Sequence, residues 1–103
     1  MENYNIILSP CAVASIEEIY EYISESLHEP TTALKNSQQI FNTIFSLKVL
    51  PTRIKLSEIE SLKSKNIRII YANNYAILFT VNEFDVVILD VIYSRSNIEV
   101  LFS

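Results

Sequence analysis

The sequence predicts an α+β fold in which a two-helix hairpin covers one face of an antiparallel sheet. Three observations support it: the first half has apolar residues at three- and four-residue spacing, the second half holds β-rich runs, and short polar connections separate them. An amphipathic hairpin must bury its apolar stripe, and a sheet offers a matching face. At 103 residues, half of them hydrophobic, residues 1–103 are expected to form one domain with one core.

The first predicted element is a short strand at residues 4–8, followed at once by a helix. Ser9 suits the N-cap position and Pro10 the first helical position, where its missing N–H costs nothing. The apolar stripe then extends the helix to about residue 28. That stripe consists of Ala12, Val13, Ile16, Ile19, Tyr20, Ile23 and Leu27. Glu17, Glu21 and Glu25 occupy the other face, as a solvated surface or as a surface for a basic partner.

The sequence His28–Thr32 breaks the pattern and leads into a second helix that runs to about Leu50 and is ended by Pro51. Its stripe consists of Leu34, Ser37, Ile40, Phe41, Ile44, Phe45, Leu47 and Lys48. So short a connection predicts an antiparallel hairpin. Residues 51–66 are polar and lysine-rich and are expected to form a loop, with one helical turn possible at residues 57–62.

Three β-rich runs follow, at residues 67–72, 75–81 and 86–93. Asn73-Asn74 is a credible two-residue hairpin turn, because Asn tolerates a positive φ. We therefore expect an antiparallel meander, and an apolar tail at residues 97–102 that packs back onto the sheet. The chain has no glycine, so its turns are expected to use Asn, Asp, Ser or Pro.

Charge and composition narrow the function. Residues 1–34 contain six acids and no Lys or Arg, whereas residues 48–68 carry a local charge of +4 on a protein of net charge −4. A domain that grips a polyphosphate unaided usually carries much more positive charge. With no secretory signal and no apolar run of about 20 residues, we expect a cytoplasmic protein without membrane contact.

The sequence offers no cofactor or metal motif. Phosphate-cradling loops need glycine, and one Cys with one His cannot form an ordinary zinc site. Cys11 and His28 lie at opposite ends of the first helix, so they form no catalytic pair. Asp90, inside an apolar strand, faces solvent or pairs with Arg68 or with an arginine of a partner.

The candidate functional residues are Arg68, Tyr93 and Arg95. In a meander the first and third strands run in the same direction, so Arg68 and Arg95 are expected toward opposite ends. Tyr93 and Arg95, with Arg53 and Lys55 from the preceding loop, are therefore the better candidate surface for phosphate binding and proton transfer. On residue types alone, exposed strand-end charges and ordinary sheet packing explain these residues better.

Several phrases resemble the RelE/ParE toxin superfamily over nearly the whole chain. They are the strand into Leu8-Ser9-Pro10, the helix Ala12–Ile23, the sequence Leu50-Pro51, and the strand phrases Ile67–Phe79 and Val87–Arg95. The resemblance implies the toxin half of a type II toxin–antitoxin pair, neutralised by a cognate antitoxin that wraps around it. It also implies a role in plasmid stabilisation and assembly as a homodimer or a toxin–antitoxin heterotetramer.

The resemblance leaves two active branches and one inactive one. RelE-like members cleave mRNA on the ribosome, which here would use Arg95, Tyr93, Arg53 and Lys55. ParE-like members bind and inhibit DNA gyrase, with Arg68, Tyr93 and Arg95 as candidate target-binding residues. A third reading is a degenerate member that binds its antitoxin without toxicity. This chain has Tyr75-Ala76 where RelE proteins carry an arginine, and it lacks their dense basic surface, so we favour the ParE-like branch.

Overall fold

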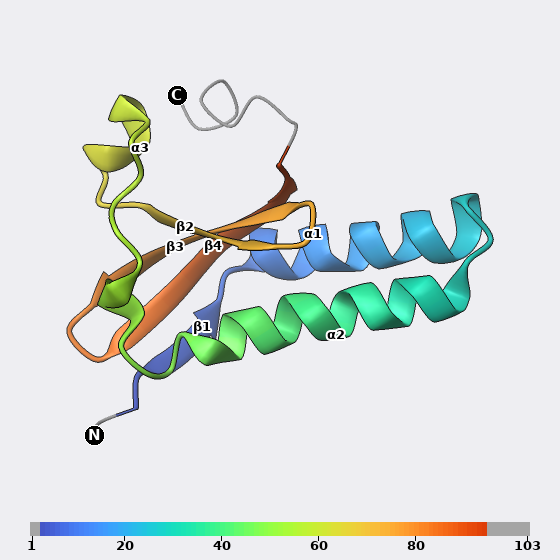
Figure 1. The fold of residues 1–103 in the computed structure, drawn as a ribbon, viewed down its shortest axis with the longest axis horizontal. Helices are drawn as coiled ribbons and strands as arrows, with labels where there is room; N and C mark the ends of the chain where they lie inside the picture. Colours follow the sequence, from blue (N-terminus) through green and yellow to red (C-terminus); the bar gives the residue numbers. More distant parts are fainter. Residues whose placement is uncertain (1–2, 95–103) are drawn as a thin grey trace.

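The structure, a computed structural model, describes residues 3–94, which form a four-stranded sheet with a helix hairpin on one face (Figure 1). In chain order the elements are β1 (Asn5–Leu8), α1 (Pro10–Glu21), the π-helical turn η1 (Tyr22–Ser26), α2 (Pro30–Ser46), the 3-10 turn η2 (Pro51–Arg53), α3 (Glu60–Lys63), β2 (Arg68–Ala72), β3 (Tyr75–Asn82) and β4 (Asp85–Tyr93). The predicted α+β fold and its element order are confirmed. The predicted tail at residues 97–102 lies outside the described residues.

The sheet is mixed rather than wholly antiparallel. Its strand order is β1-β4-β3-β2, and β2, β3 and β4 form the predicted meander. β1 adds a fourth strand parallel to β4, with Asn5 opposite Asp85 and Leu8 opposite Ile88. The hairpin of helices between β1 and the meander is the long crossover that a parallel pair requires. β1 and β2 are therefore the two edges of the sheet.

The main core lies between this sheet and the helix hairpin. α1 and α2 lie side by side on one face, and α3 lies on the other side (Figure 1). Fully buried side chains from the helices and from the middle strands meet there, including Ile40, Ile44, Ile77, Phe79 and Ile88. A smaller cluster on the opposite face joins Leu62, Ile67, Ala76 and Leu78. Burying side chains of this size stabilises the fold by about 1.5–3 kcal/mol each.

The two predicted apolar stripes are only partly buried. Ala12, Ile16 and Ile23 of the first helical segment face the core, as do Ala33, Ile40 and Ile44 of α2. Five apolar members of the stripes are exposed, which the spacing alone did not predict: Val13, Tyr20, Leu27, Leu34 and Phe45. The hairpin therefore keeps apolar side chains on surfaces that face away from the core.

The helix ends explain how the hairpin is held. The Ser9 hydroxyl accepts a hydrogen bond from the Ala12 N–H (3.1 Å) and donates one to the Leu89 carbonyl (2.8 Å), so one residue caps α1 and attaches it to β4. α2 ends at Ser46, one turn earlier than expected, because the chain turns through Leu50 before Pro51. The helical turn predicted at residues 57–62 is confirmed as α3, slightly later in the chain.

The turns use more residue types than expected. Asn66 and Asn73 take a positive φ, as the composition predicted. His28, Leu50 and Glu83 also take a positive φ, so the expectation that turns rely on Asn, Asp, Ser or Pro was wrong at these three positions. For such residues the left-handed conformation costs about 1–2 kcal/mol, which the surrounding contacts must offset.

Candidate functional site

A groove of about 810 Å³ lies between the helix hairpin and the end of the sheet. In Figure 1 the far end of the hairpin projects beyond the sheet. The lining of the groove comes from α1, η1, the start of α2 and the adjoining ends of β3 and β4: Ser15, Glu18, Ile19, Tyr22, Ile23, Leu27, Glu29, Thr32, Tyr75, Val91, Ile92 and Tyr93. We refer to it below as the tyrosine groove.

Two of its tyrosines form a pair at the end of the sheet. Tyr75 begins β3 and is directly opposite Tyr93, the last residue of β4. Their ring centroids are 5.9 Å apart with an interplanar angle of 67°, an edge-to-face contact. The Asn73-Asn74 turn brings the strands together here, and the Ser94 N–H donates to the Asn74 carbonyl at 2.7 Å. The pairing was not predicted, although the register of the three strand runs implied it.

The environment of Tyr75 makes it a poor general base. Burial raises the pKa of the Tyr75 phenol above its ordinary value, and the neighbouring Tyr93 raises it further, against a lowering by the Asn36 side chain. A phenol with a raised pKa stays protonated at neutral pH. Tyr75 can donate a hydrogen bond or pack against a ligand, but it is not poised to accept a proton.

The helical wall of the groove contains a π-helical turn. The Leu27 N–H donates to the Tyr22 carbonyl five residues earlier (3.1 Å), and the Glu29 N–H donates to the Ile23 carbonyl (3.0 Å). The turn adds a residue to one helical turn, so the side chains after it leave the α-helical phase. Leu27 is consequently 51% exposed, although the spacing placed it on the buried stripe. Tyr22, at the start of the turn, is 59% exposed.

The structure does not bring Arg53 and Lys55 to Tyr93. Arg53 lies at the carboxyl end of α2, where its guanidinium donates to the carbonyls of Ser46 (3.4 Å), Val49 (2.6 Å) and Leu50 (3.0 Å). That end of α2 lies beside the start of β1, since the Tyr4 N–H donates to the Lys48 carbonyl. Tyr93 is the last residue of β4 and so lies at the far end of that strand. Arg53 thus caps a helix, a role that cations favour at this end.

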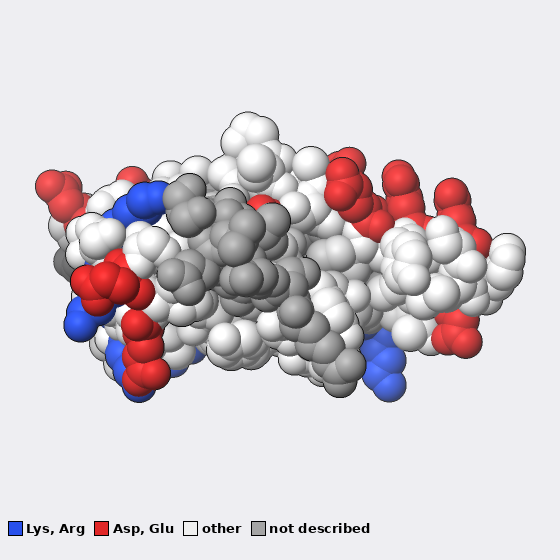
Figure 2. All heavy atoms as spheres, turned by 90° about the horizontal axis from the view of Figure 1, so that it is seen from above, with Lys and Arg blue, Asp and Glu red and all other residues white. Residues whose placement is uncertain are grey.

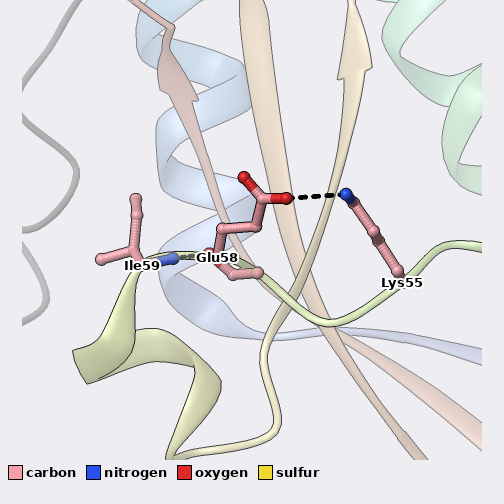
Figure 3. Close-up of polar contacts among 4 residues, drawn as sticks. Lys55, Glu58 and Ile59 are labelled. Atoms are coloured by element: carbon pink, nitrogen blue, oxygen red, sulfur yellow. Dashed lines mark hydrogen bonds and ion pairs between the residues drawn. The ribbon is translucent and has the colours of Figure 1, made fainter.

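Lys55 is paired within its own loop. Its ammonium group lies 2.8 Å from the Glu58 carboxylate, and both side chains are largely exposed (Figure 3). The hydrogen bond and charge of Glu58 raise the pKa of Lys55, and Lys55 in turn lowers the pKa of Glu58. The next turn of the loop is fixed by the Ile59 N–H, which donates to the Ser57 hydroxyl (Figure 3).

Arg68 and Tyr93 lie toward opposite ends of the sheet. Arg68 is opposite Phe79, which is opposite Ile88, so Tyr93 is five residues further along β4, roughly 16 Å. The Arg68 guanidinium donates to the Ile54 carbonyl at 2.6 Å and so holds the loop against β2. Arg95, the third predicted residue, lies outside the described residues.

Asp90 has a structural partner that the sequence did not reveal. Its carboxylate accepts hydrogen bonds from the Ser15 hydroxyl of α1 and from the Val91 N–H (2.8 Å). Asp90 is opposite Leu78, whereas Phe79 is opposite Ile88, so Leu89 is the extra residue of a β-bulge. The bulge places Asp90 against the helix hairpin. Of the alternatives left open by the sequence, pairing with Arg68 was wrong, because Arg68 donates to the Ile54 carbonyl instead.

Within residues 3–94 no cluster of three or more His, Cys, Asp and Glu side chains is arranged to hold a metal ion. Across the same span, no helix combines the length and the apolar character needed to cross a bilayer. Cys11 is an exposed free thiol. The described surface thus offers a groove, apolar side chains and a charge gradient, but it shows no compact catalytic cluster.

Comparison with known proteins decides the family. The model for the ParE toxin of the type II toxin–antitoxin system parDE matches residues 6–98. The chain belongs to the ParE toxin family. The ParE fold is also that of a solved chromosomal ParDE toxin–antitoxin system from P. aeruginosa, with a TM-score of 0.75 and 20% sequence identity over 89% of this chain and 97% of that one.

A second solved structure shares the fold of this ParE chain. It is the RelBE2 toxin–antitoxin complex of Mycobacterium tuberculosis, with a TM-score of 0.63 and 17% identity over 93% of this chain and 97% of that one. Among curated proteins no sequence matches. At these identities the structural likeness shows the fold alone. The predicted membership of the RelE/ParE superfamily, on its ParE side, is confirmed by the family match.

Proposed function

We propose that this ParE family toxin acts by binding DNA gyrase and inhibiting it, and that a cognate antitoxin neutralises it by binding in turn. One observation carries the proposal. Two of the four residues assigned to RNA cleavage, Arg53 and Lys55, hydrogen-bond to groups of their own loop and to the end of α2. Tyr93 lies at the opposite end of β4 from them.

RNA cleavage would need groups that residues 3–94 do not gather in one place. A reaction in which a 2′-hydroxyl attacks the adjacent phosphate requires cations at the developing negative charge and a group that moves a proton. At the position where RelE-like chains carry an arginine, this chain has Tyr75, and the pKa of its phenol is raised. Binding to a protein target asks for none of these groups.

The antitoxin partner is supported by family and by fold. Both solved relatives are described as toxin–antitoxin systems or complexes, one ParDE and the other RelBE2. A chain of this family is expected to meet its antitoxin and its target in the cytoplasm. Assembly as a homodimer or as a toxin–antitoxin heterotetramer, and a contribution to plasmid stabilisation, are parts of the same proposal.

The proposed target-binding residues are Arg68, Tyr93 and Arg95. Tyr93 is 40% exposed at the end of β4, so its ring is available to a partner. Arg95 follows two residues later in the sequence. Arg68 also holds Ile54, so its replacement is expected to affect the loop as well as binding. Tyr93 and Arg95 are therefore the cleaner positions to test.

Two parallel assays test the proposal. Purified protein is expected to inhibit supercoiling by purified gyrase and to leave mRNA intact in a translating extract. Arg95→Ala and Tyr93→Ala should weaken inhibition, while Lys55→Ala should not. Cleavage of mRNA that disappears with Arg95→Ala would establish the RelE-like function instead. If expression without antitoxin causes no gyrase inhibition, no mRNA cleavage and no growth arrest, the protein is a non-toxic member of the family.

A further inference from the structure

We propose that the free edge of β1 is a homodimer interface, at which the β1 strands of two copies of this chain pair antiparallel about a two-fold axis. This inference rests on the homodimer that is part of the proposed function, and it adds the surface and the register of the contact. A two-fold axis brings the same edge of both copies together, so the edge must be complementary to itself. Three properties of β1 meet that condition.

The first property is an open row of backbone groups. The N–H groups of Asn5 and Ser9 donate to carbonyls on the β4 side, at 2.8 and 3.1 Å. Backbone groups alternate in direction along a strand, so those of Ile6 and Leu8 point away from the sheet. Within residues 3–94 no group accepts a hydrogen bond from either of these two N–H groups. Such a row is a template for pairing with another strand.

The opposite edge of the sheet is partly covered. Leu56 pairs antiparallel with Arg68 at the start of β2. The Ser57 N–H donates to the Ile67 carbonyl at 2.9 Å, so the loop before α3 shields this part of the edge. β1 has no strand on its outer side among the described residues. It also contains none of the charged residues, prolines or bulges that commonly protect an edge strand.

The second property is the length of the open row. The Tyr4 N–H already donates to the end of α2 at 2.8 Å, and Pro10 has no N–H. A two-fold axis at Ile7 places Ile6 opposite Leu8 of the second copy, so that every open N–H meets a carbonyl. The two positions that cannot donate, Tyr4 and Pro10, then lie opposite each other. Ile7, which is 45% exposed, lies against its own counterpart in a non-hydrogen-bonded pair, where side chains approach most closely.

The third property is the order of charges along the edge. α2 ends beside β1 (Figure 1), and the hollow there, of about 370 Å³, is lined by Ile6 and Lys48 among others. The hollow at the other end of β1, of about 350 Å³, is lined by residues that include Leu8, Glu17 and Glu21. Antiparallel pairing brings the lysine end of each copy toward the glutamate end of the other, so opposite charges meet on both sides of the axis.

Apolar side chains connect the two hollows. Phe41 lines one hollow and Phe45 lines the other, and their rings stack with centroids 6.1 Å apart. Phe45 is 48% exposed, and Val13 and Tyr20, in the hollow beside Leu8, are 39% and 37% exposed. A short strand pair alone buries too little surface for a stable dimer. These side chains supply further apolar surface beside the paired strands.

Crosslinking of the full chain tests the register. The starting protein is Cys11→Ser, which removes the one cysteine. Opposite Cα atoms in an antiparallel non-hydrogen-bonded pair are about 4.5 Å apart, within the range of a disulfide. Ile7→Cys in that background should therefore form an intermolecular disulfide under mild oxidation, visible as a dimer on a non-reducing gel. Tyr71→Cys, at a 58% exposed position on the β2 edge, should remain monomeric.

Sedimentation equilibrium measures the dimer in solution. Ile7→Lys should raise the Kd of the dimer by at least about tenfold, because it places like charges opposite each other, and Tyr71→Lys should change it by less than about twofold. Lys48→Glu should also weaken the dimer. Adding Glu17→Lys to Lys48→Glu should restore most of the loss, whereas adding Glu18→Lys should not, because Glu18 lines the tyrosine groove.

The outcomes separate this inference from the proposed function. A chain that stays monomeric at its highest soluble concentration would overturn the β1 interface, and so would a disulfide that forms as readily in Tyr71→Cys as in Ile7→Cys. Circular dichroism shows whether Ile7→Lys folds, and crosslinking decides the matter if it does not. A monomer that still inhibits gyrase defeats this inference and leaves the proposed function standing. A dimer linked through Ile7→Cys that neither inhibits gyrase nor binds an antitoxin supports the interface and defeats the proposed function.

Discussion

Single residues in this fold carry strain and anchoring that the sequence pattern does not display. Leu50 takes the left-handed conformation, with φ 49° and ψ 55°, while its side chain is 57% exposed. Its backbone, rather than its packing, is therefore what matters to stability. Leu34 is a comparable exposed leucine, 53% exposed, in the regular helix α2.

Replacing each leucine with glycine should have opposite effects. Leu50→Gly removes the clash of Cβ in a left-handed residue, so the free energy of unfolding should rise by up to about 1 kcal/mol. Leu34→Gly should lower it by about 1 kcal/mol, because glycine is unfavourable inside a helix. Urea unfolding followed by circular dichroism measures both. A loss of stability in Leu50→Gly would show that its side chain contributes more than its backbone costs.

Asp90 should act as an anchor between β4 and α1. Asp90→Ala removes the acceptor of both the Ser15 hydroxyl and the Val91 N–H, so the free energy of unfolding should fall by about 1–3 kcal/mol. Asp90→Asn keeps an acceptor and should cost less. Asp85→Ala is the control, since Asp85 accepts only an exposed hydrogen bond from Asn5, and it should change stability by less than about 0.5 kcal/mol. Equal effects at the two positions would contradict the anchor.

Tyr75 gives stability a dependence on alkaline pH. Its pKa is raised in the folded state, mainly by burial, so the fold favours the neutral phenol. The stabilisation that Tyr75 gives the folded state is complete below the unfolded pKa of about 10. It is lost as the pH rises through the pKa of Tyr75 in the folded state. Unfolding measured from about pH 8 to about pH 11 should therefore show a steeper loss in the native protein than in Tyr75→Phe. Identical slopes would show that Tyr75 titrates alike in both states.

At the scale of elements, α2 depends on a cap from outside the helix. Arg53 donates to carbonyls at its carboxyl end, so Arg53→Ala should lower the free energy of unfolding by about 1 kcal/mol and speed amide exchange in the last turn of α2. Lys55→Ala should change neither measurement, because its ion pair with Glu58 is exposed. If amide exchange in the last turn of α2 is unchanged in Arg53→Ala, Arg53 does not cap the helix and is available for a functional role.

Local signals predicted the elements well because their causes are local. Ser9 and Pro10 mark the start of α1, and Asn73 supplies the positive φ of the first hairpin. The place of β1 beside β4 could not be predicted in this way, because parallel pairing is decided across the whole chain. The bulge at Leu89 is equally non-local, and with it the contact between Asp90 and α1.

The candidate site was harder to predict than the fold. Tyr93 was singled out from the sequence and does line the tyrosine groove, but Arg53 and Lys55 are not brought to it. Leu27 was assigned to the buried stripe, because a π-helical turn leaves no spacing signal and the stripe appeared to continue through it. Tyr22 was not singled out as a site residue. The sequence did show the acidic character of the hairpin, which residues 1–34 carry without any base.

At the scale of the whole molecule, the fold separates two kinds of surface. One end holds the projecting hairpin and the tyrosine groove, and the other holds α3 and the lysine-containing loop (Figure 1). In Figure 2 most of the Lys and Arg side chains in view lie at the end away from the projecting hairpin, whereas acidic side chains lie at both ends. Neither end gathers a compact catalytic cluster among the described residues. Under the proposed function the protein inhibits gyrase by occupying a surface of it, so inhibition should follow binding stoichiometry rather than turnover.

Direct titration of purified gyrase with the intact chain tests this central claim. Isothermal calorimetry should show saturable binding at a fixed stoichiometry, with supercoiling activity falling in proportion to the gyrase bound and returning when purified antitoxin is added. An absence of binding at micromolar concentrations, together with catalytic loss of mRNA at substoichiometric amounts of the chain, would contradict the account.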